Sequence, residues 1–137
     1  MEKEFIPYEQ ALALKELGFD EPCLAQYKKY DVGEATLNIG ATLDIGFSKN
    51  EIIMQFHKLS KFCSAPTFSQ AFRWFREKYN LESHIKKDWT NGICNGDEAI
   101  IEDEDGLIGV GTFNTYEEAE LECLKKLIEI VKDGENR

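Results

Sequence analysis

Four aromatic side chains between residues 68 and 79 constrain the fold more than any other feature of the sequence. They recur at i, i+4, i+7 and i+11, which places them on one face of a helix: Phe68, Phe72, Phe75 and Tyr79. Pro66 interrupts the preceding segment, and Thr67 with Gln70 can form a capping box where the helix begins. Burial of each ring contributes on the order of 2 kcal/mol, so we expect this face to belong to the core.

Two further helices are predicted near the ends of the chain. The first runs from Pro7, which suits a first helical position, to Gly18, which suits the left-handed residue that ends a helix. The last begins with a capping box of Thr115 and Glu118 and ends at Gly134. Its apolar spacing predicts a buried face made of Ala119, Cys123, Leu124, Leu127, Ile128 and Val131.

A fourth helix is predicted in the middle of the N-terminal half. Ser48 and Glu51 have the spacing of a capping box. Apolar residues then follow at helical spacing: Ile52, Ile53, Phe56 and Leu59.

Extended segments with turn signals between them alternate with these helices. They cover residues 23–30, 34–45, 84–89, 99–103 and 107–113. The first two predict an N-terminal hairpin, and the last three predict an antiparallel meander with turns at Asn91-Gly92 and Asn95-Gly96. The sequence contains no internal repeat and no long linker. We therefore predict a single α+β domain over residues 1–137, in which an antiparallel sheet is packed by about four helices.

The composition is that of a soluble globular protein. The chain has 137 residues, 42% of them hydrophobic, and it can bury a core without a metal or a disulfide. No window approaches the roughly 18 apolar residues of a membrane span, so we expect no membrane association. The start of the sequence lacks the basic flank and apolar run of a secretion signal, which favours a cytoplasmic protein.

The cysteines favour free structural thiols. Four of them are spread along the chain: Cys23, Cys63, Cys94 and Cys123. None forms a Cys-x-x-Cys pair, and no histidine lies at the spacing of a zinc ligand. We therefore expect neither a metal nor a cofactor.

The sequence contains no motif of a known catalytic class. The glycines of residues 106–111 fall in a predicted hairpin rather than between a strand and a helix, so they do not make a phosphate loop. A Cys63–His84 or a Cys94–His57 dyad remains open, and a small hydrolase or nuclease is the remaining hypothesis for the function. We rank that reading last and predict that the protein is not an enzyme.

Charge is distributed unevenly along the sequence. The net charge of −10 disfavours non-specific binding to nucleic acids. Residues 49–90 nevertheless hold eight lysines and arginines against four acidic residues, a balance of +4, which leaves −14 for the rest. Guanidinium groups bind phosphate and indole rings stack on bases. The candidates for a site that binds a small anionic nucleotide, such as a cyclic nucleotide, are therefore Arg73, Trp74, Arg76, Lys78, Lys86, Lys87 and Trp89.

This cluster spans the third helix and the strand that follows it. With the aromatic face turned inward, Arg73, Arg76 and Asn80 lie on the outer face, and Trp74 and Lys78 lie at its margin. The alternative is ordinary surface charge, with an i,i+4 pair of Arg73 and Glu77 and half-buried tryptophans.

An acidic segment lies farther along the chain. It lacks the alternating ligands and the distant bidentate glutamate of a calcium loop, so a solvated hairpin is the favoured reading. Such a patch can also imitate a nucleic-acid backbone toward a basic protein partner, and the candidates for that role are Glu102, Asp103, Glu104 and Asp105.

Three blocks of sequence together resemble a family of small proteins of unknown function that bacteriophages and prophages encode, many of them from gut bacteria. They are EFIPYEQALALKELGFDEPC (residues 4–23), APTFSQAFRWFREKY (residues 65–79) and TYEEAELECLKKLIEIV (residues 115–131). The blocks cover about 40% of the chain.

The resemblance implies a setting rather than a reaction. It suggests an accessory binding protein in the cytoplasm of a bacterial host that counteracts host defence, either by sequestering a cyclic nucleotide or by blocking a host protein. The alternative is a structural or assembly protein of a phage that self-associates as a homo-oligomer through its first and last helices.

Overall fold

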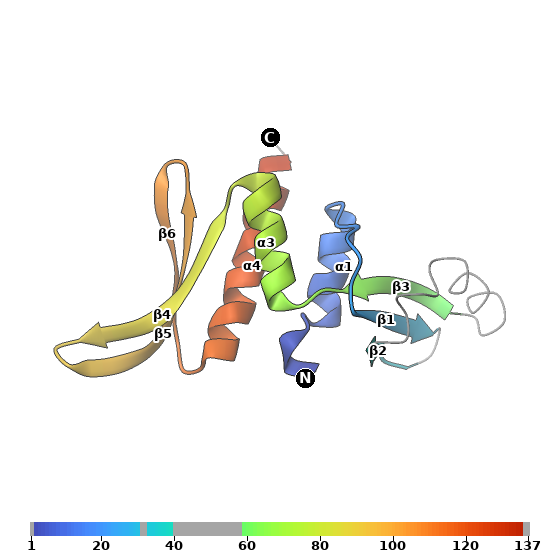
Figure 1. Ribbon diagram of the computed structural model, residues 1–137, viewed down its shortest axis with the longest axis horizontal. Coiled ribbons are helices and arrows are strands. Elements are labelled where there is room, and N and C mark those ends of the chain that lie inside the picture. The colour runs from blue at the N-terminus through green and yellow to red at the C-terminus, as the bar shows by residue number, and fades with distance from the viewer. Residues whose placement is uncertain (1, 31–32, 40–58, 136–137) are drawn as a thin grey trace. The chain divides into compact units, whose positions relative to one another are not determined.

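The computed structural model describes residues 2–30, 33–39 and 59–135, which fall into two compact units (Figure 1). The first unit is Met1–Thr67 and the second is Phe68–Arg137. Each contains its own three-stranded antiparallel sheet. The predicted α+β class is therefore confirmed, but the strands form two separate sheets instead of one.

The first unit combines a short helix with a small sheet. It contains a 3₁₀ turn η1 (Glu2–Glu4), helix α1 (Tyr8–Glu16) and strands β1 (Ala25–Tyr30), β2 (Thr36–Ile39) and β3 (Leu59–Ala65). The sheet order is β2-β1-β3, so the predicted hairpin of β1 and β2 is present and β3 extends it.

Helix α1 begins and ends as the sequence predicts. Pro7 is the extended residue just before the first turn, and Gly18 adopts a φ of 101° just after the last. The N–H of Phe19 donates to the carbonyl oxygen of Leu14 at 2.9 Å, which closes the end of the helix.

A small apolar cluster lies within the first unit. Phe5, Ala25 and Ala65 are buried together, with Tyr27 and Leu37 packed against them. The Tyr27 hydroxyl donates to the carbonyl oxygen of Ile6 at 2.8 Å, which ties the segment before α1 to the sheet.

The prediction of a helix ending near Leu59 is wrong at its C-terminal end. Residues 48 and 51–58 lie outside the described residues, but Leu59 begins strand β3, which pairs with β1 along its whole length. Cys63 and Ala65 are both buried, in keeping with the alternation of a strand. The described part of the chain contains three α-helices rather than the expected four.

The second unit packs two helices with a meander. It contains helices α3 (Phe68–Tyr79) and α4 (Tyr116–Glu135) and strands β4 (Glu82–Thr90), β5 (Ile93–Asp103) and β6 (Gly106–Phe113). The sheet order is β4-β5-β6. Helix α4 lies against all three strands, and α3 packs against α4 and β4.

The core of the second unit largely matches the sequence prediction. All six residues predicted for the inner face of α4 are buried, and the N–H of Glu118 donates to the Thr115 hydroxyl at 3.1 Å. Phe68 and Phe75 are buried, whereas Phe72 and Tyr79 are only partly covered. Gly134 does not end the last helix, which continues to Glu135.

Candidate functional site

The predicted basic and aromatic cluster does not form one surface. Trp74, expected at the margin of the outer face, is only 5% exposed. Its ring makes edge-on contacts with Phe75 and Tyr79, at centroid distances of 5.1 and 5.4 Å. The Lys78 amine lies 4.9 Å above it. Trp74 therefore belongs to the core and cannot stack on a ligand base.

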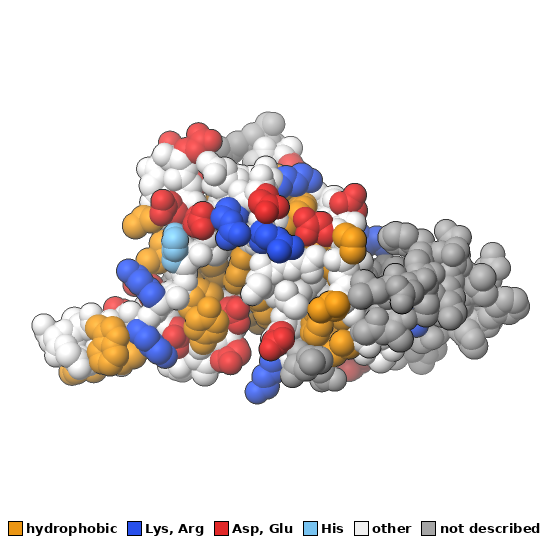
Figure 2. Space-filling model, viewed as in Figure 1, with side chains coloured by type: hydrophobic (Ala, Val, Ile, Leu, Met, Phe, Trp, Pro, Cys, Tyr) orange, Lys and Arg blue, Asp and Glu red, His pale blue; other side chains and the backbone are white. Residues whose placement is uncertain are grey.

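Several of the predicted cations are paired with carboxylates. Arg76 lies 3.8 Å from Glu82, Lys86 lies 4.0 Å from Glu98, and Lys87 lies 3.1 Å from Asp97. Lys86 and Lys87 are consecutive in β4, so they point to opposite faces of the sheet. Arg73 is exposed on the outer face of α3, as predicted. On the face drawn in Figure 2, basic and acidic side chains lie interspersed.

The pair of Lys87 and Asp97 is the most buried of these contacts. Asp97 is only 3% exposed, and its hydrogen bond and negative charge raise the pKa of Lys87. The same carboxylate lies near the start of α4. Burial, and then the charges of Glu120 and Asp97, raise the pKa of Tyr116. Asp97 is thus a buried carboxylate near two exposed side chains, Lys87 and Tyr116, and Lys87 is already paired with it.

Trp89, by contrast, is 64% exposed at the end of a projecting hairpin. Strands β4 and β5 continue past the end of β6, whose pairing with β5 begins at Asp97 (Figure 1). We call residues 88–96 the arm. Ile93, also on the arm, is 66% exposed. Figure 2 shows apolar side chains gathered at the projecting end of this hairpin.

A two-residue turn and a bulge shape the arm. Asn91 and Gly92 have φ values of 52° and 79°, as in the tight turns that suit antiparallel hairpins. Cys94 pairs with Trp89 and Ile93 pairs with Thr90, so Trp89 and Ile93 point to opposite faces. The arm therefore exposes a large apolar side chain on each of its faces.

The arm was missed because Asn95-Gly96 was predicted to be a second turn. The structure instead places this dipeptide inside β5, at a register shift opposite Asp88 and Trp89. The Asn95 amide donates to the Thr90 hydroxyl at 3.0 Å, which braces the two strands. Strand β5 therefore begins at Ile93 rather than at residue 99. The apolar residues that directly follow Asn91-Gly92 were the available signal for it.

The acidic segment forms the turn between β5 and β6. Asp103 accepts hydrogen bonds from the N–H groups of Asp105 and Gly106, at 2.8 and 3.1 Å. Glu102, Glu104 and Asp105 are exposed. The segment is thus a hairpin turn with solvated carboxylates, and its role toward a basic partner stays a prediction.

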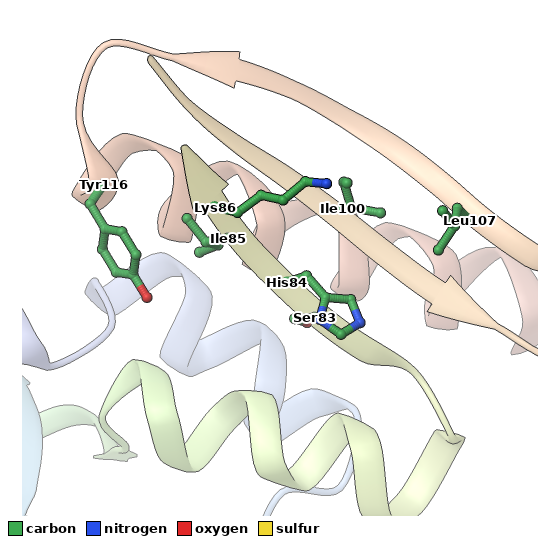
Figure 3. A pocket seen from close by; sticks show the side chains of 7 residues that line it. All are labelled: Ser83, His84, Ile85, Lys86, Ile100, Leu107 and Tyr116. Atoms are coloured by element: carbon green, nitrogen blue, oxygen red, sulfur yellow. The ribbon is translucent and has the colours of Figure 1, made fainter. Parts of the chain in front are cut away.

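A shallow hollow of about 530 Å³ follows β4 (Figure 3). Its walls come from β4, from the two strands beyond it and from the start of α4: Ser83, His84, Ile85, Lys86, Ile100, Leu107 and Tyr116. Lys86 reaches across the sheet toward Ile100 in Figure 3. The His84 ring lies 3.5 Å from Glu102. The hollow mixes one amine, one imidazole and three aliphatic side chains, with no convergent set of cations.

Comparison of the chain with protein-family models, with curated proteins and with solved structures finds no match. No helix among the described residues is long and apolar enough to span a membrane. In the same part of the chain, no three His, Cys, Asp or Glu side chains are grouped so that they could hold a metal ion.

The cysteines are all free thiols. Cys23, Cys63 and Cys123 are buried, whereas Cys94 is exposed on the arm. Burial raises the pKa of the Cys123 thiol, and the neighbouring Ser83 hydroxyl offsets only part of that shift. Of the two dyads left open by the sequence, one needs His57, which lies outside the described residues. The other needs Cys63 and His84, which belong to different units.

Replacement of Glu120 by glutamine is expected to stabilise the protein at neutral pH. Burial, and then the charge of Glu117, raise the pKa of Glu120 in the folded state. The folded protein therefore binds this proton more readily than the unfolded chain does, and stability is lost as the pH rises through the raised pKa. We expect Glu120→Gln to raise Tm by about 1–3 °C at neutral pH, with the gain vanishing below about pH 4.

Thermal unfolding followed by circular dichroism across this pH range measures the effect. Glu129→Gln is the matched control, because Glu129 is an exposed residue of the same helix that pairs with Lys126. A lower Tm for Glu120→Gln at neutral pH would contradict the assignment.

Proposed function

We propose that the protein is a non-enzymatic binding protein whose arm inserts into an apolar cleft of another protein. The observation that carries this proposal is the exposure of Trp89 and Ile93, at 64% and 66%, on opposite faces of one hairpin end. Tryptophan is the side chain most enriched among the residues that dominate binding energy at protein interfaces.

The form of the arm favours a concave partner site. Its two-residue turn is narrow, and its bulge and the bond from Asn95 to Thr90 hold the two strands together. A flat partner would cover only one face and leave either Trp89 or Ile93 in water. A cleft covers both, so an enzyme cleft that the arm would plug is the partner class that fits best.

The nucleotide version of the function has less support. An anionic base-bearing ligand needs unpaired cations beside an exposed ring. Trp74 is buried, and Arg76, Lys86 and Lys87 face carboxylates. Trp89 is exposed but lies on the arm, beyond these pairs. The resemblance to phage-encoded proteins supports a host protein as the target, in the cytoplasm of a bacterium, and interference with host defence as the purpose.

Capture of partners from a bacterial lysate tests the proposal with one matched pair of variants. Trp89→Ser/Ile93→Ser removes both apolar side chains of the arm. Leu24→Ser removes a side chain that is 57% exposed in the first unit. We expect a stoichiometric partner to bind the natural chain and the Leu24→Ser variant. Its recovery with the arm variant should fall at least about tenfold, the loss expected when side chains that dominate an interface are truncated.

Equal recovery of that partner by the arm variant would refute the proposal, as would the absence of any partner. Calorimetry with cyclic di- and trinucleotides tests the alternative. Tight, salt-sensitive binding that Arg73→Ala or Arg76→Ala abolishes without lowering Tm would favour the nucleotide function instead. Charge reversal at Glu102, Glu104 and Asp105 shows whether the acidic turn contributes to protein binding.

A further inference from the structure

Strand β6 is an edge strand that carries no charge. Among the described residues it pairs with β5 alone, and its outer edge has no ladder. Its eight residues, Gly-Leu-Ile-Gly-Val-Gly-Thr-Phe, include neither a charged residue nor a proline. The opposite edge, β4, is different because it carries five ionisable side chains: Glu82, His84, Lys86, Lys87 and Asp88.

The edge of β4 is therefore protected against pairing with another chain, whereas the edge of β6 is less protected. Lysines, other charges and bulges are the usual devices that keep an edge strand from pairing with another chain. Strand β4 carries two lysines and three other ionisable side chains. Strand β6 has a single bulge at Val110, in a chain where 31% of the residues are charged. The outer edge of β6 is therefore available for strand pairing.

The face of β6 that points away from α4 has a protruding leucine side chain and a hollow. Leu107 is 67% exposed. A hollow of about 310 Å³ lies beside it, and the residues that line it include Glu98, Ile100, Gly109, Val110, Gly111 and Thr112. Leu107 stands at one end of the strand and Thr112 at the other. If a two-fold axis lay beside the outer edge of β6, at its middle, Leu107 of each copy would lie at the Thr112 end of the other copy's hollow.

We propose that β6 pairs antiparallel with β6 of a second copy, which joins the two meanders into one six-stranded sheet. Full overlap of the two eight-residue strands sets Leu107 opposite Thr112 of the second copy. The bulge in β6 permits this register because it places Leu107 and Thr112 on the same face of the sheet. Leu107 pairs with Glu102 and Thr112 with Glu98. These glutamates are four positions apart in β5, so Leu107 and Thr112 lie on one face although they are five positions apart in β6. In a regular strand they would lie on opposite faces.

Charge selects the antiparallel arrangement. The acidic turn formed by Asp103, Glu104 and Asp105 directly precedes β6. Parallel pairing would set the two acidic turns side by side, where like charges repel. Antiparallel pairing places them at opposite ends of the new ladder. It also gives the closed two-fold symmetry that most homodimers adopt. This inference does not depend on the arm or on its partner.

Sedimentation equilibrium of the full chain between about 1 and about 100 µM tests the inference, because dimerisation depends on protomer concentration. We expect the mass of two chains at the upper end. Leu107→Lys and Thr112→Lys should each weaken dimerisation at least about tenfold, because each introduces a charge at the ladder. Leu107→Lys/Thr112→Glu should restore it, since each lysine would then face a glutamate of the other copy.

Trp89→Ser is the control, because its side chain is as exposed as that of Leu107 but lies on the arm. It should leave dimerisation unchanged. Leu107 is exposed, so Leu107→Lys should keep the natural Tm. A monomer at the highest concentration would overturn the inference and leave the edge to a strand from a different protein. A dimer that Leu107→Lys does not weaken would overturn it as well.

Discussion

Replacement of Phe75 by alanine is expected to lower the free energy of unfolding by about 3–5 kcal/mol. The Phe75 side chain is fully buried in the second unit. Its ring lies 5.1 Å from the Trp74 ring and 6.0 Å from the Tyr79 ring, so alanine would leave a cavity lined by large, rigid side chains. Because whole domains are stable by only about 5–15 kcal/mol, this loss should leave the second unit close to unfolding.

Urea denaturation followed by tryptophan fluorescence measures this loss, since Trp74 lies against the site. Phe72→Ala is the matched control. It removes the same ring from the same helix, but at a position that is only partly covered. The free energy of unfolding of the Phe72→Ala control should fall by clearly less. Equal losses for the two variants would show that Phe75 does not occupy the centre of this core.

Gly96→Ala should be the next most damaging single change, with a loss of about 2–3 kcal/mol. Gly96 has a φ of 137°, a region that residues with a side chain rarely adopt. A Cβ atom there would collide with the backbone carbonyl oxygen of Phe113 in β6. Both strands would have to shift at the point where the arm leaves the sheet.

Gly109→Ala is the comparison that isolates this effect. It adds the same methyl group in the neighbouring strand, where nothing lies within 4 Å of it. Its stability should change by no more than about 0.5 kcal/mol. Chemical denaturation of the two variants side by side gives the difference, and a Gly96→Ala protein as stable as the natural one would contradict the described backbone.

The helices could be predicted because their signals are local. The inner face of α4 follows from apolar spacing alone, and each of its six predicted residues is buried. The prediction failed for Trp74 because α3 packs against both α4 and β4. A helix with two neighbours buries more than one stripe, and the buried set of α3 is Phe68, Ala71, Trp74 and Phe75.

The strands were harder to predict because their partners are distant in the sequence. Strand β3 pairs with β1 although residues 31–58 lie between the two strands, and the helical spacing after Glu51 concealed the start of β3. The Asn95-Gly96 dipeptide correctly signalled a glycine with positive φ. A bulge needs that conformation as much as a turn does, and here the bulge let the strand continue.

The side chains of the predicted ligand site are dispersed for the same reason. Lys86 faces Glu98 and Lys87 faces Asp97 as direct neighbours across β4 and β5. Only the register of the two strands reveals these pairs, because composition counts the lysines without their partners. The exposure of Trp89 likewise follows from β6 ending its pairing at Asp97, which no local pattern encodes.

The chain passes from the first unit to the second only once, between Thr67 and Phe68. Every described strand of each sheet therefore comes from one uninterrupted half of the polypeptide. During synthesis the N-terminal half leaves the ribosome first, with all the described partners of its sheet already present. Folding can accordingly proceed in the direction of translation, one sheet after the other.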